Sequence, residues 1–486
     1  MNLPRDVEIV TARRLIVVVG LAYLVLQLIS FSLDRPSGWD EAVYLSQVSP
    51  DGAPLPFTPY RARGITLLAI PVLQLGGSLA QLRLFLAVAS AAAMIASFRM
   101  WSPVIGYGAV ATALLFAGAW PTLFYGSELM PNLWVALIAA AATAVLARRI
   151  AGRVGRSDEL VAGGLVAVAA LIRPLDAVVL TAALVLLPIV MRRATISWTV
   201  HLVLGLVAGW APWLVEMTAR FGSPGEAFAA AARMSPAGRW SLFGNVRQYL
   251  ALSDGPTIGS TFAHDIPASG LFWFVGMTIL VVLGIRAAAR RSILPSLVVP
   301  TAAGIALAAE YIVFTDAQAP RFLLPALALL AVPAGLGLVT IVAETGALVE
   351  SDRRRFARRA VASILVITWA IVQLGIASSV EADAADQRAS AQRAGLEVRK
   401  LSAGKPCHVY SEGSFPIVGF AAGCRAAPLG KALALWKDRA GHLERDGVRV
   451  FLVLRRTEAL PPPEGSALLA DVPAQGNLRW FVYGSV

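Results

Sequence analysis

The chain has 486 residues, of which 57% are hydrophobic and 15% are charged, and its formal net charge is +12 at pH 7. Long apolar runs recur from end to end, which excludes an ordinary soluble domain and predicts a polytopic helical membrane protein. So large a positive charge is also compatible with nucleic-acid binding. Most basic residues, however, stand in short clusters between apolar runs, the pattern of cytoplasmic loops. We therefore interpret the charge as a topology signal and expect no nucleic-acid partner.

The first apolar run, residues 15–33, follows Arg13 and Arg14 and is longer than the core of a usual signal peptide, so we interpret it as a retained anchor helix. Spanning helices are expected, about eleven in all, at residues 15–33, 82–98, 104–120, 133–146, 160–172, 177–190, 198–215, 271–285, 293–314, 322–342 and 360–380. The run at 65–75 is too short to span and is assigned to the outer interface.

Basic clusters at Arg148, Arg192, Arg290 and Arg353 place alternate loops on the cytoplasmic side. The remaining loops, and everything after residue 380, then lie outside the cell. We therefore expect a multi-pass protein of the inner (plasma) membrane with two domains: a transmembrane domain at 1–380 and an extracytoplasmic domain at 381–486.

The C-terminal segment has an ordinary polar balance and alternating apolar patterns. A helix is expected at 384–401, and short strands at 407–410, 448–454 and 480–483, which together predict a small α/β domain. This segment contains the only two cysteines, Cys407 and Cys424. An isolated pair predicts one disulfide in an oxidising compartment, and two buried free thiols are the alternative.

Two adjacent carboxylates follow the first span, in the sequence Gly38-Trp39-Asp40-Glu41-Ala42-Val43-Tyr44. A third acid, Glu128, stands in the second outer loop. An ionised carboxylate at the membrane surface can accept a proton from an attacking hydroxyl, so these three acids are the candidate catalytic groups. The alternatives are a solvated loop or a helix start for Asp40 and Glu41, and a helix-dipole partner for Glu128.

Aromatic residues flank the acidic pair. Trp39 and Tyr44 are candidate contacts for the acceptor substrate, and the alternative is that they belong to the interfacial aromatic belt.

Arginines accompany these acids on the predicted outer side. An arginine fork stays charged and grips phosphate through two hydrogen bonds, so this set predicts a phosphate-linked substrate. The candidate phosphate-binding residues are Arg61, Arg63, Arg173 and Arg321. Lipid-headgroup anchoring is the alternative for Arg61 and Arg63, and capping of a helix end is the alternative for Arg173.

His264 and Asp265 are adjacent in the long outer loop and are assigned an auxiliary role at the acceptor. Neighbouring residues are poorly spaced as two ligands from one regular element, so a divalent cation is compatible with this pair but not required by it. No phosphate-binding glycine loop or dinucleotide-binding motif occurs in the sequence. The sequence therefore does not decide whether the protein uses a metal ion or another cofactor.

Four features together resemble a known family. They are the Asp40-Glu41 pair after the first span, the acidic loop Gly126-Ser127-Glu128-Leu129-Met130-Pro131-Asn132, the turn Leu171-Ile172-Arg173-Pro174, and the run Pro320-Arg321-Phe322-Leu323-Leu324-Pro325. This pattern resembles the GT-C membrane glycosyltransferases, in the branch of the protein O-mannosyltransferases and the lipid A aminoarabinose transferase, over nearly the whole chain.

The resemblance implies transfer of a sugar from a polyprenyl-phosphate donor to a lipid, glycan or protein acceptor on the outer face. The aspartate of the first loop is the base in that family, and the matching residue is Asp40. A single displacement would invert the anomeric centre. The segment at 59–64 lacks the Lys-Pro-Pro run of the aminoarabinose branch, and the second-loop acid is Glu instead of Asp, which leaves the sugar and the acceptor open.

Two other classes compete with this interpretation. A transporter or flippase for lipid-linked sugars also needs outer arginines, but it typically has charges deep inside its spans or related broken helices. A scaffold subunit whose outer domain binds cell-wall polymer would tolerate loss of Asp40.

Overall fold

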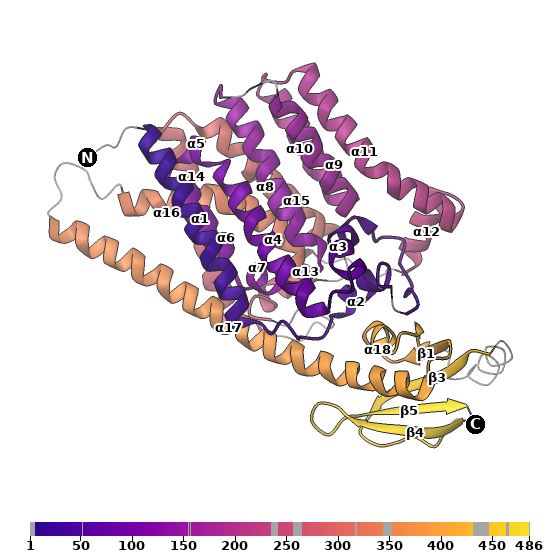
Figure 1. Ribbon diagram of the computed structural model, residues 1–486. Helices are drawn as coiled ribbons and strands as arrows, with labels where there is room; N and C mark the ends of the chain where they lie inside the picture. The colour runs from indigo at the N-terminus through magenta and orange to yellow at the C-terminus, as the bar shows by residue number, and fades with distance from the viewer. Residues whose placement is uncertain are drawn as a thin grey trace. The chain divides into compact units, whose positions relative to one another are not determined.

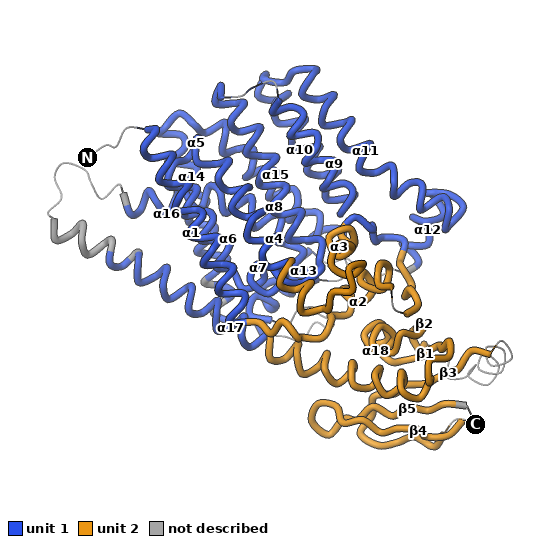
Figure 2. Tube along the Cα trace, in the orientation of Figure 1, with its two compact units in different colours: residues 1–30, 59–64, 86–380 blue, residues 31–58, 65–85, 381–486 orange. Residues whose placement is uncertain are grey.

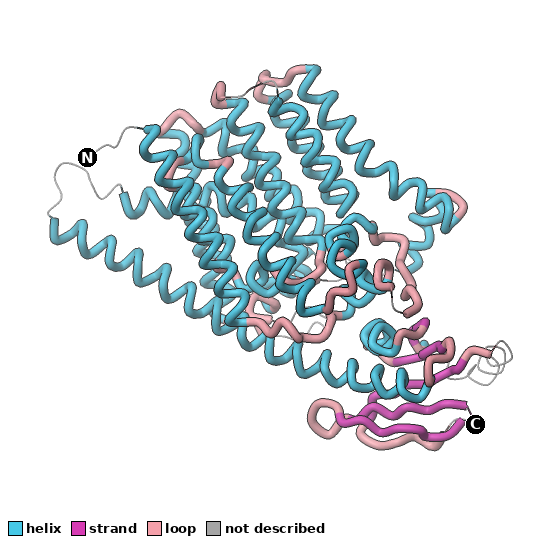
Figure 3. The backbone as a smooth tube through the Cα atoms, in the orientation of Figure 1, coloured by secondary structure: helices cyan, strands magenta, loops and turns pink. Residues whose placement is uncertain are grey.

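The computed structural model consists of helices and one small sheet (Figure 1 and Figure 3). The residues that it describes are 5–50, 52–153, 155, 157–234, 242–255, 265–315, 318–343, 352–430, 447–462 and 466–485. They form two compact units: unit 1 contains residues 1–30, 59–64 and 86–380, and unit 2 contains 31–58, 65–85 and 381–486 (Figure 2). Unit 2 therefore includes the C-terminal segment and two earlier pieces of the chain.

Eight of the described helices are long and apolar enough to cross a membrane. These are α1 (Arg5–Ser30), α4 (Leu79–Arg99), α8 (Pro131–Ile150), α11 (Ile196–Phe221), α14 (Ala268–Arg290), α15 (Leu294–Phe314), α16 (Leu324–Ala343) and α17 (Asp352–Ser402). Three shorter helices, α6 (Gly108–Ala117), α9 (Ser157–Ile172) and α10 (Pro174–Val190), cover further predicted spans. The predicted class, a helical multi-pass membrane protein with a small C-terminal α/β domain, is confirmed.

The predicted span at 104–120 is not a continuous helix. It is divided into α5 (Ser102–Ile105), α6 and α7 (Trp120–Tyr125). Gly106 has a φ of 54°, a conformation that favours glycine, and it ends α5. Ala119 is extended and Pro121 lies in the first turn of α7, where proline is tolerated, so a new helix begins there.

Short elements complete the helical part. They are α2 (Trp39–Ser46), η1 (Arg63–Leu68), α3 (Ile70–Gln74), α12 (Pro224–Met234), α13 (Leu242–Ala251), η2 (Pro320–Leu323) and α18 (Phe415–Ala422). The run at 65–75, assigned to the interface, forms η1 and α3.

The interior of unit 1 is an apolar cluster contributed by α8, α9, α10, α11, α15 and α16. Helices α9 and α11 approach most closely at glycines, since a Cβ on Gly205 would stand 2.1 Å from the carbonyl oxygen of Gly163. Small residues allow such contact between membrane helices, whose association depends on van der Waals packing.

The sheet of unit 2 has five strands in the order β2-β1-β3-β5-β4. The strands are β1 (Cys407–Ser411), β2 (Arg425–Pro428), β3 (Arg449–Arg456), β4 (Ser466–Pro473) and β5 (Arg479–Ser485). Strand β1 is parallel to β2 and β3, and β5 is antiparallel to β3 and β4. Trp480 donates to Ser390 Oγ at 3.2 Å, which ties the sheet to α17.

The predicted disulfide is present: Cys407 and Cys424 are bonded, with their Cα atoms 4.9 Å apart. Helix α17 is continuous, so the last predicted span, 360–380, and the predicted amphipathic helix, 384–401, are one element.

Candidate active site

The two adjacent acids lie in the first turn of α2, in unit 2. Gly38 is the N-cap, and its backbone N–H donates to Glu41 Oε2 at 3.1 Å, as in a capping box. Asp40 is partly exposed, whereas Glu41 is buried. Consecutive helical residues point about 100° apart, so one of the two carboxylates can face inward while the other stays accessible.

Glu41 is held by a buried arginine from α4. Arg83 Nη2 lies 2.8 Å from Glu41 Oε2, and neither side chain is exposed. The same guanidinium donates to the carbonyl oxygens of Arg35 at 3.1 Å and Pro36 at 3.3 Å. Arg35 in turn forms an ion pair with Glu381 of α17. These four alternating charges, which we call the buried charge network (Arg35, Glu41, Arg83 and Glu381), fix the loop that leads into α2.

Both aromatics of the acidic motif take part in packing within unit 2. Trp39 Nε1 donates to the carbonyl oxygen of Gly413 at 2.9 Å, and its ring meets Phe415 edge-on at 5.5 Å. Tyr44 is buried against Phe57, with ring centroids 6.0 Å apart.

In unit 1, two of the predicted phosphate-binding arginines meet. Arg173, the N-cap of α10, and Arg321 of η2 both stack on Phe322, with guanidinium carbons 5.9 Å and 5.0 Å from its ring centroid. Phe322 also lies parallel to Tyr311, at 5.1 Å between centroids. The hydroxyl of Tyr249 on α13 lies within electrostatic range of both arginines. We group it with them as the arginine–aromatic cluster (Arg173, Tyr249, Tyr311, Arg321 and Phe322).

The two arginines differ in how their charge is compensated. Arg173 Nε lies 2.9 Å from Asp176 Oδ1, and Tyr311 donates to the same oxygen at 2.6 Å and contacts Arg173. Arg321 is buried, lying 5.9 Å from the ring of Tyr125. Arg173 is therefore partly neutralised by its own turn, and the stacked aromatics hold both guanidinium planes in place.

Tyr249 adds an unsatisfied polar group to this cluster. Its hydroxyl is buried and, within the described part of the chain, has no hydrogen-bond partner. Burial raises the pKa of the Tyr249 hydroxyl, and the positive charges of Arg321 and Arg173 oppose that rise. A buried hydroxyl without a partner costs free energy unless a ligand or water supplies one.

The remaining predicted residues of unit 1 have other surroundings. Arg61 is buried, with its guanidinium 5.1 Å from the ring of Tyr60. Arg63 pairs with Glu216 at 2.8 Å, so its charge is compensated by α11. Glu128 is buried in the turn between α7 and α8, where its carbonyl accepts from Met130 N at 2.8 Å.

His264 lies outside the described residues, and Asp265 is exposed shortly before α14. Among the residues that the structure describes, no group of three or more His, Cys, Asp or Glu side chains could hold a metal ion.

Several residues of these sites were missed by the sequence analysis, among them Arg83, Tyr311 and Tyr249. Arg83 could have been found, because a charge within an apolar span carries a structural or functional role by default. Tyr311 and Tyr249 gave no such signal, since one tyrosine in a span or a loop is unremarkable until its neighbours are known.

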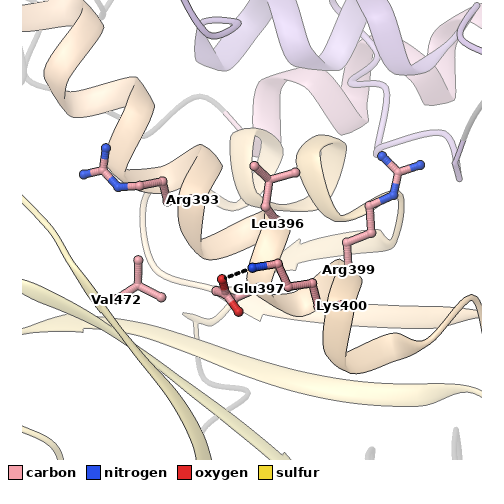
Figure 4. Close-up of a pocket in the computed structure, with 6 residues that line it drawn as sticks. All are labelled: Arg393, Leu396, Glu397, Arg399, Lys400 and Val472. Atoms are coloured by element: carbon pink, nitrogen blue, oxygen red, sulfur yellow. Dashed lines mark hydrogen bonds and ion pairs between the residues drawn. The ribbon is translucent and has the colours of Figure 1, made fainter.

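A shallow cavity of ≈ 440 Å³ lies between α17 and β4 in unit 2. Lys400 pairs with Glu397 at 2.6 Å there, and Arg393 and Arg399 extend away from that pair (Figure 4). These side chains form a solvated basic face, to which we assign no chemistry.

The bundle of apolar helices, with an acidic first-loop helix and a small C-terminal sheet, defines a membrane protein of the GT-C fold. No family model matches the chain, and no curated protein matches it in sequence. Solved structures do match its fold, and those described below are GT-C membrane glycosyltransferases.

The first of these is ArnT from Cupriavidus metallidurans bound to undecaprenyl phosphate, with a TM-score of 0.66 and 16% identity over 96% of this chain and 97% of ArnT. The second is the oligosaccharyltransferase AglB from Archaeoglobus fulgidus, with a TM-score of 0.56 and 12% identity over 91% of this chain and 69% of AglB. The arabinofuranosyltransferase AftD from Mycobacteria matches with a TM-score of 0.57 and 13% identity over 97% of this chain and 40% of AftD. The resemblance drawn from the sequence is confirmed at the level of the fold.

Proposed function

We propose that this protein is a membrane glycosyltransferase that moves a sugar from a polyprenyl-phosphate donor to an acceptor at the extracytoplasmic face of the plasma membrane. The observation that carries the proposal is the arginine–aromatic cluster, where Arg173 and Arg321 meet beside the unsatisfied hydroxyl of Tyr249. Two guanidinium groups and a hydroxyl donor suit a phosphate monoester. The fold is also that of ArnT, which was solved with undecaprenyl phosphate.

The chemistry assigns a role to each group. An acceptor hydroxyl attacks the anomeric carbon, its proton passes to Asp40, and the bond from that carbon to the phosphate oxygen breaks. Negative charge then builds on the departing polyprenyl phosphate, where a guanidinium stabilises it. Arg173 and Arg321 are together the proposed phosphate ligands, because both guanidinium groups stack on Phe322. A single displacement of this kind inverts the anomeric centre.

Glu41 has a positioning role in this proposal. Its carboxylate is enclosed by Arg83, so it orients the first turn of α2, and Asp40 is left as the accessible base. Arg61 and Arg63 are both candidates for additional phosphate ligands, and Arg63 also pairs with Glu216. Glu128, Trp39, Tyr44, His264 and Asp265 remain candidates for the acceptor side.

The base is tested by Asp40→Asn in proteoliposomes supplied with radiolabelled polyprenyl-phosphate pentoses and hexoses and native membrane acceptors. This change keeps the size of the side chain and removes the proton acceptor, so transfer should fall by about 100-fold or more while the protein stays folded. Asp386→Asn, at an exposed acid of α17 that has no role in the proposed reaction, is the matched control. Transfer by Asp40→Asn at the wild-type rate would refute the base. Movement of the labelled lipid across the bilayer without transfer would favour the flippase.

The phosphate site can be tested without knowing the sugar, because the proposed reaction releases a polyprenyl phosphate, and undecaprenyl phosphate is the one bound in the ArnT structure. Arg321→Ala should weaken binding of undecaprenyl phosphate by about 10- to 100-fold, the worth of a charge-assisted hydrogen bond. Arg220→Ala is the control, since Arg220 pairs with Glu216 on an exposed helix face. Equal binding by both variants would remove Arg321 from the site.

A further inference from the structure

A larger cavity, of ≈ 920 Å³, lies within unit 1 where α8 ends and α9 and α11 begin. Its polar lining consists of Arg149, Glu159, Arg193, Thr195, Ser197 and His201. Arg173 of the arginine–aromatic cluster follows the last residue of α9. The cavity and that cluster therefore stand at opposite ends of a helix of 16 residues, about 24 Å apart by helix rise. Nothing in the proposed reaction uses this second site.

One wall of the cavity is a closed polar network. Arg149 Nη1 pairs with Glu159 Oε1 at 2.5 Å, and Arg149 Nη2 donates to Thr195 Oγ1 at 2.7 Å. The guanidinium also lies 5.5 Å from the ring of Trp198, which is buried. Ser197 donates to the second oxygen of Glu159. Arg149 and Glu159 thus compensate each other and give the cavity a fixed shape.

The other polar groups keep unused hydrogen-bonding capacity. Within the described part of the chain, Arg193 makes one hydrogen bond, from Nη1 to the carbonyl oxygen of Ile150 at 2.6 Å, which leaves its other N–H groups available. His201 Nδ1 lies 2.7 Å from the carbonyl oxygen of Ser197, so Nε2 is the ring nitrogen left for a ligand. Arg193 adds a positive charge that the Arg149–Glu159 pair does not cancel, and an anion suits this cavity.

An apolar stripe runs along α11 from the same cavity. Ile196, Val200 and Leu204 are spaced at i, i+4 and i+8 and are 84%, 44% and 61% exposed, so they share one face of the helix. Leu160, which lines the cavity on α9, is 65% exposed. A membrane helix presents such a face to lipid chains. The ligand that matches both features is amphiphilic, with an anionic head and an aliphatic tail.

We propose that this cavity binds the headgroup phosphate of an anionic phospholipid, with one acyl chain along Ile196, Val200 and Leu204. Basic pockets between membrane helices recognise lipid headgroups in this way. An uncompensated Arg193 favours phosphatidylglycerol over phosphatidylcholine, because the choline cation would meet a positive surface. The neighbouring Arg148 and Arg192 assign the site to the cytoplasmic leaflet, opposite the proposed reaction.

Native mass spectrometry of the full chain, delipidated and then titrated with either lipid, tests the proposal. The wild type should retain phosphatidylglycerol in preference to phosphatidylcholine. Arg193→Gln should bind phosphatidylglycerol about tenfold more weakly, since one charge-assisted contact is lost. His201→Gln removes the imidazole ring from the cavity and should weaken binding less, whereas Arg193→Lys keeps the charge and should restore part of the affinity. Arg286→Gln, at an exposed arginine away from the cavity, is the matched control.

Three results would overturn the proposal. Equal retention of both lipids by the wild type would show that the protein does not distinguish the two headgroups by their charge. Loss of the preference in Arg286→Gln to the same extent as in Arg193→Gln would mean that net charge, and not this cavity, selects the lipid. Displacement of the bound lipid by millimolar inorganic phosphate, with equal thermal stabilisation by phosphate alone, would assign the cavity to a soluble phosphate.

Discussion

Removal of Arg83 should destabilise the protein far more than removal of a surface arginine, because it takes a buried positive charge away from the buried carboxylate of Glu41. Arg83 and Glu41 are 2.8 Å apart and neither side chain is exposed. Without the guanidinium, the Gly38 amide would remain as a donor to Glu41, and two backbone carbonyls would lose their donor. Breaking a buried pair in this way costs about 3–5 kcal/mol. We expect Arg83→Met to lose most of that amount.

The comparison that makes this prediction sharp is Arg63→Met. Arg63 also forms a 2.8 Å pair, with Glu216, but its side chain is 39% exposed. Such a pair contributes about 0–1 kcal/mol. The free energy of unfolding would be measured for both variants and for the double variant Glu41→Leu/Arg83→Met. Each protein would be held in the same lipid bilayer discs and titrated with a denaturing detergent. The double variant should recover part of the loss, because no unpaired charge stays buried.

Equal destabilisation by Arg83→Met and Arg63→Met would refute the reasoning, because it would show that burial of the pair does not set its worth. A double variant less stable than Arg83→Met alone would refute the idea that the remaining buried carboxylate causes the loss of stability. At temperatures where Arg83→Met remains folded, it should also lower the rate of transfer, since Glu41 orients the first turn that carries Asp40.

Three further predictions follow from other contacts. Replacing Cys407 and Cys424 by Ser opens a loop with a separation of 17 residues and should cost about 3 kcal/mol of stability. The double variant should unfold before the oxidised wild type, and reductant should destabilise only the wild type. Gly64→Ala should reduce folded yield, because its Cβ would stand 2.2 Å from a carbonyl oxygen of α9, whereas Gly76→Ala meets nothing within 4 Å and is limited by its φ alone. Thiol labelling of Gln475→Cys and Arg290→Cys from outside intact cells should modify the first and not the second, and labelling of both would contradict the topology.

The spanning helices could be predicted from the sequence because a bilayer requires each crossing to be about 20 apolar residues long. The interruption of the predicted span at 104–120 could also have been predicted, since Gly106 and Pro121 stand near the two ends of that span. The continuity of α17 could not have been predicted, because the polar residues after Val380 fit either a helix or a loop. Strand β4 was missed because its exposed, irregular pairing with β5 gives no clean alternation.

The site was harder to predict than the fold, because the sequence supplies charges but not their neighbours. Asp40 and Glu41 are chemically similar, and only the position of Arg83 separates an enclosed carboxylate from an accessible one. Arg173 and Arg321 were both predicted to bind phosphate, yet their meeting at Phe322 depends on the packing of helices far apart in the chain. Whether Asp40 joins that cluster remains a prediction.

The division of the chain into two compact units falls inside helices. Helix α4 contributes residues 79–85 to unit 2 and 86–99 to unit 1, and α17 changes units after Val380. The C-terminal segment is therefore not a detachable module. A truncation at residue 380 would remove Glu381 and strip Arg35 of its ion-pair partner. A chimaera that exchanges this part between related proteins must carry residues 31–58 and 65–85 with it, and sequence changes in these three segments are expected to be inherited together.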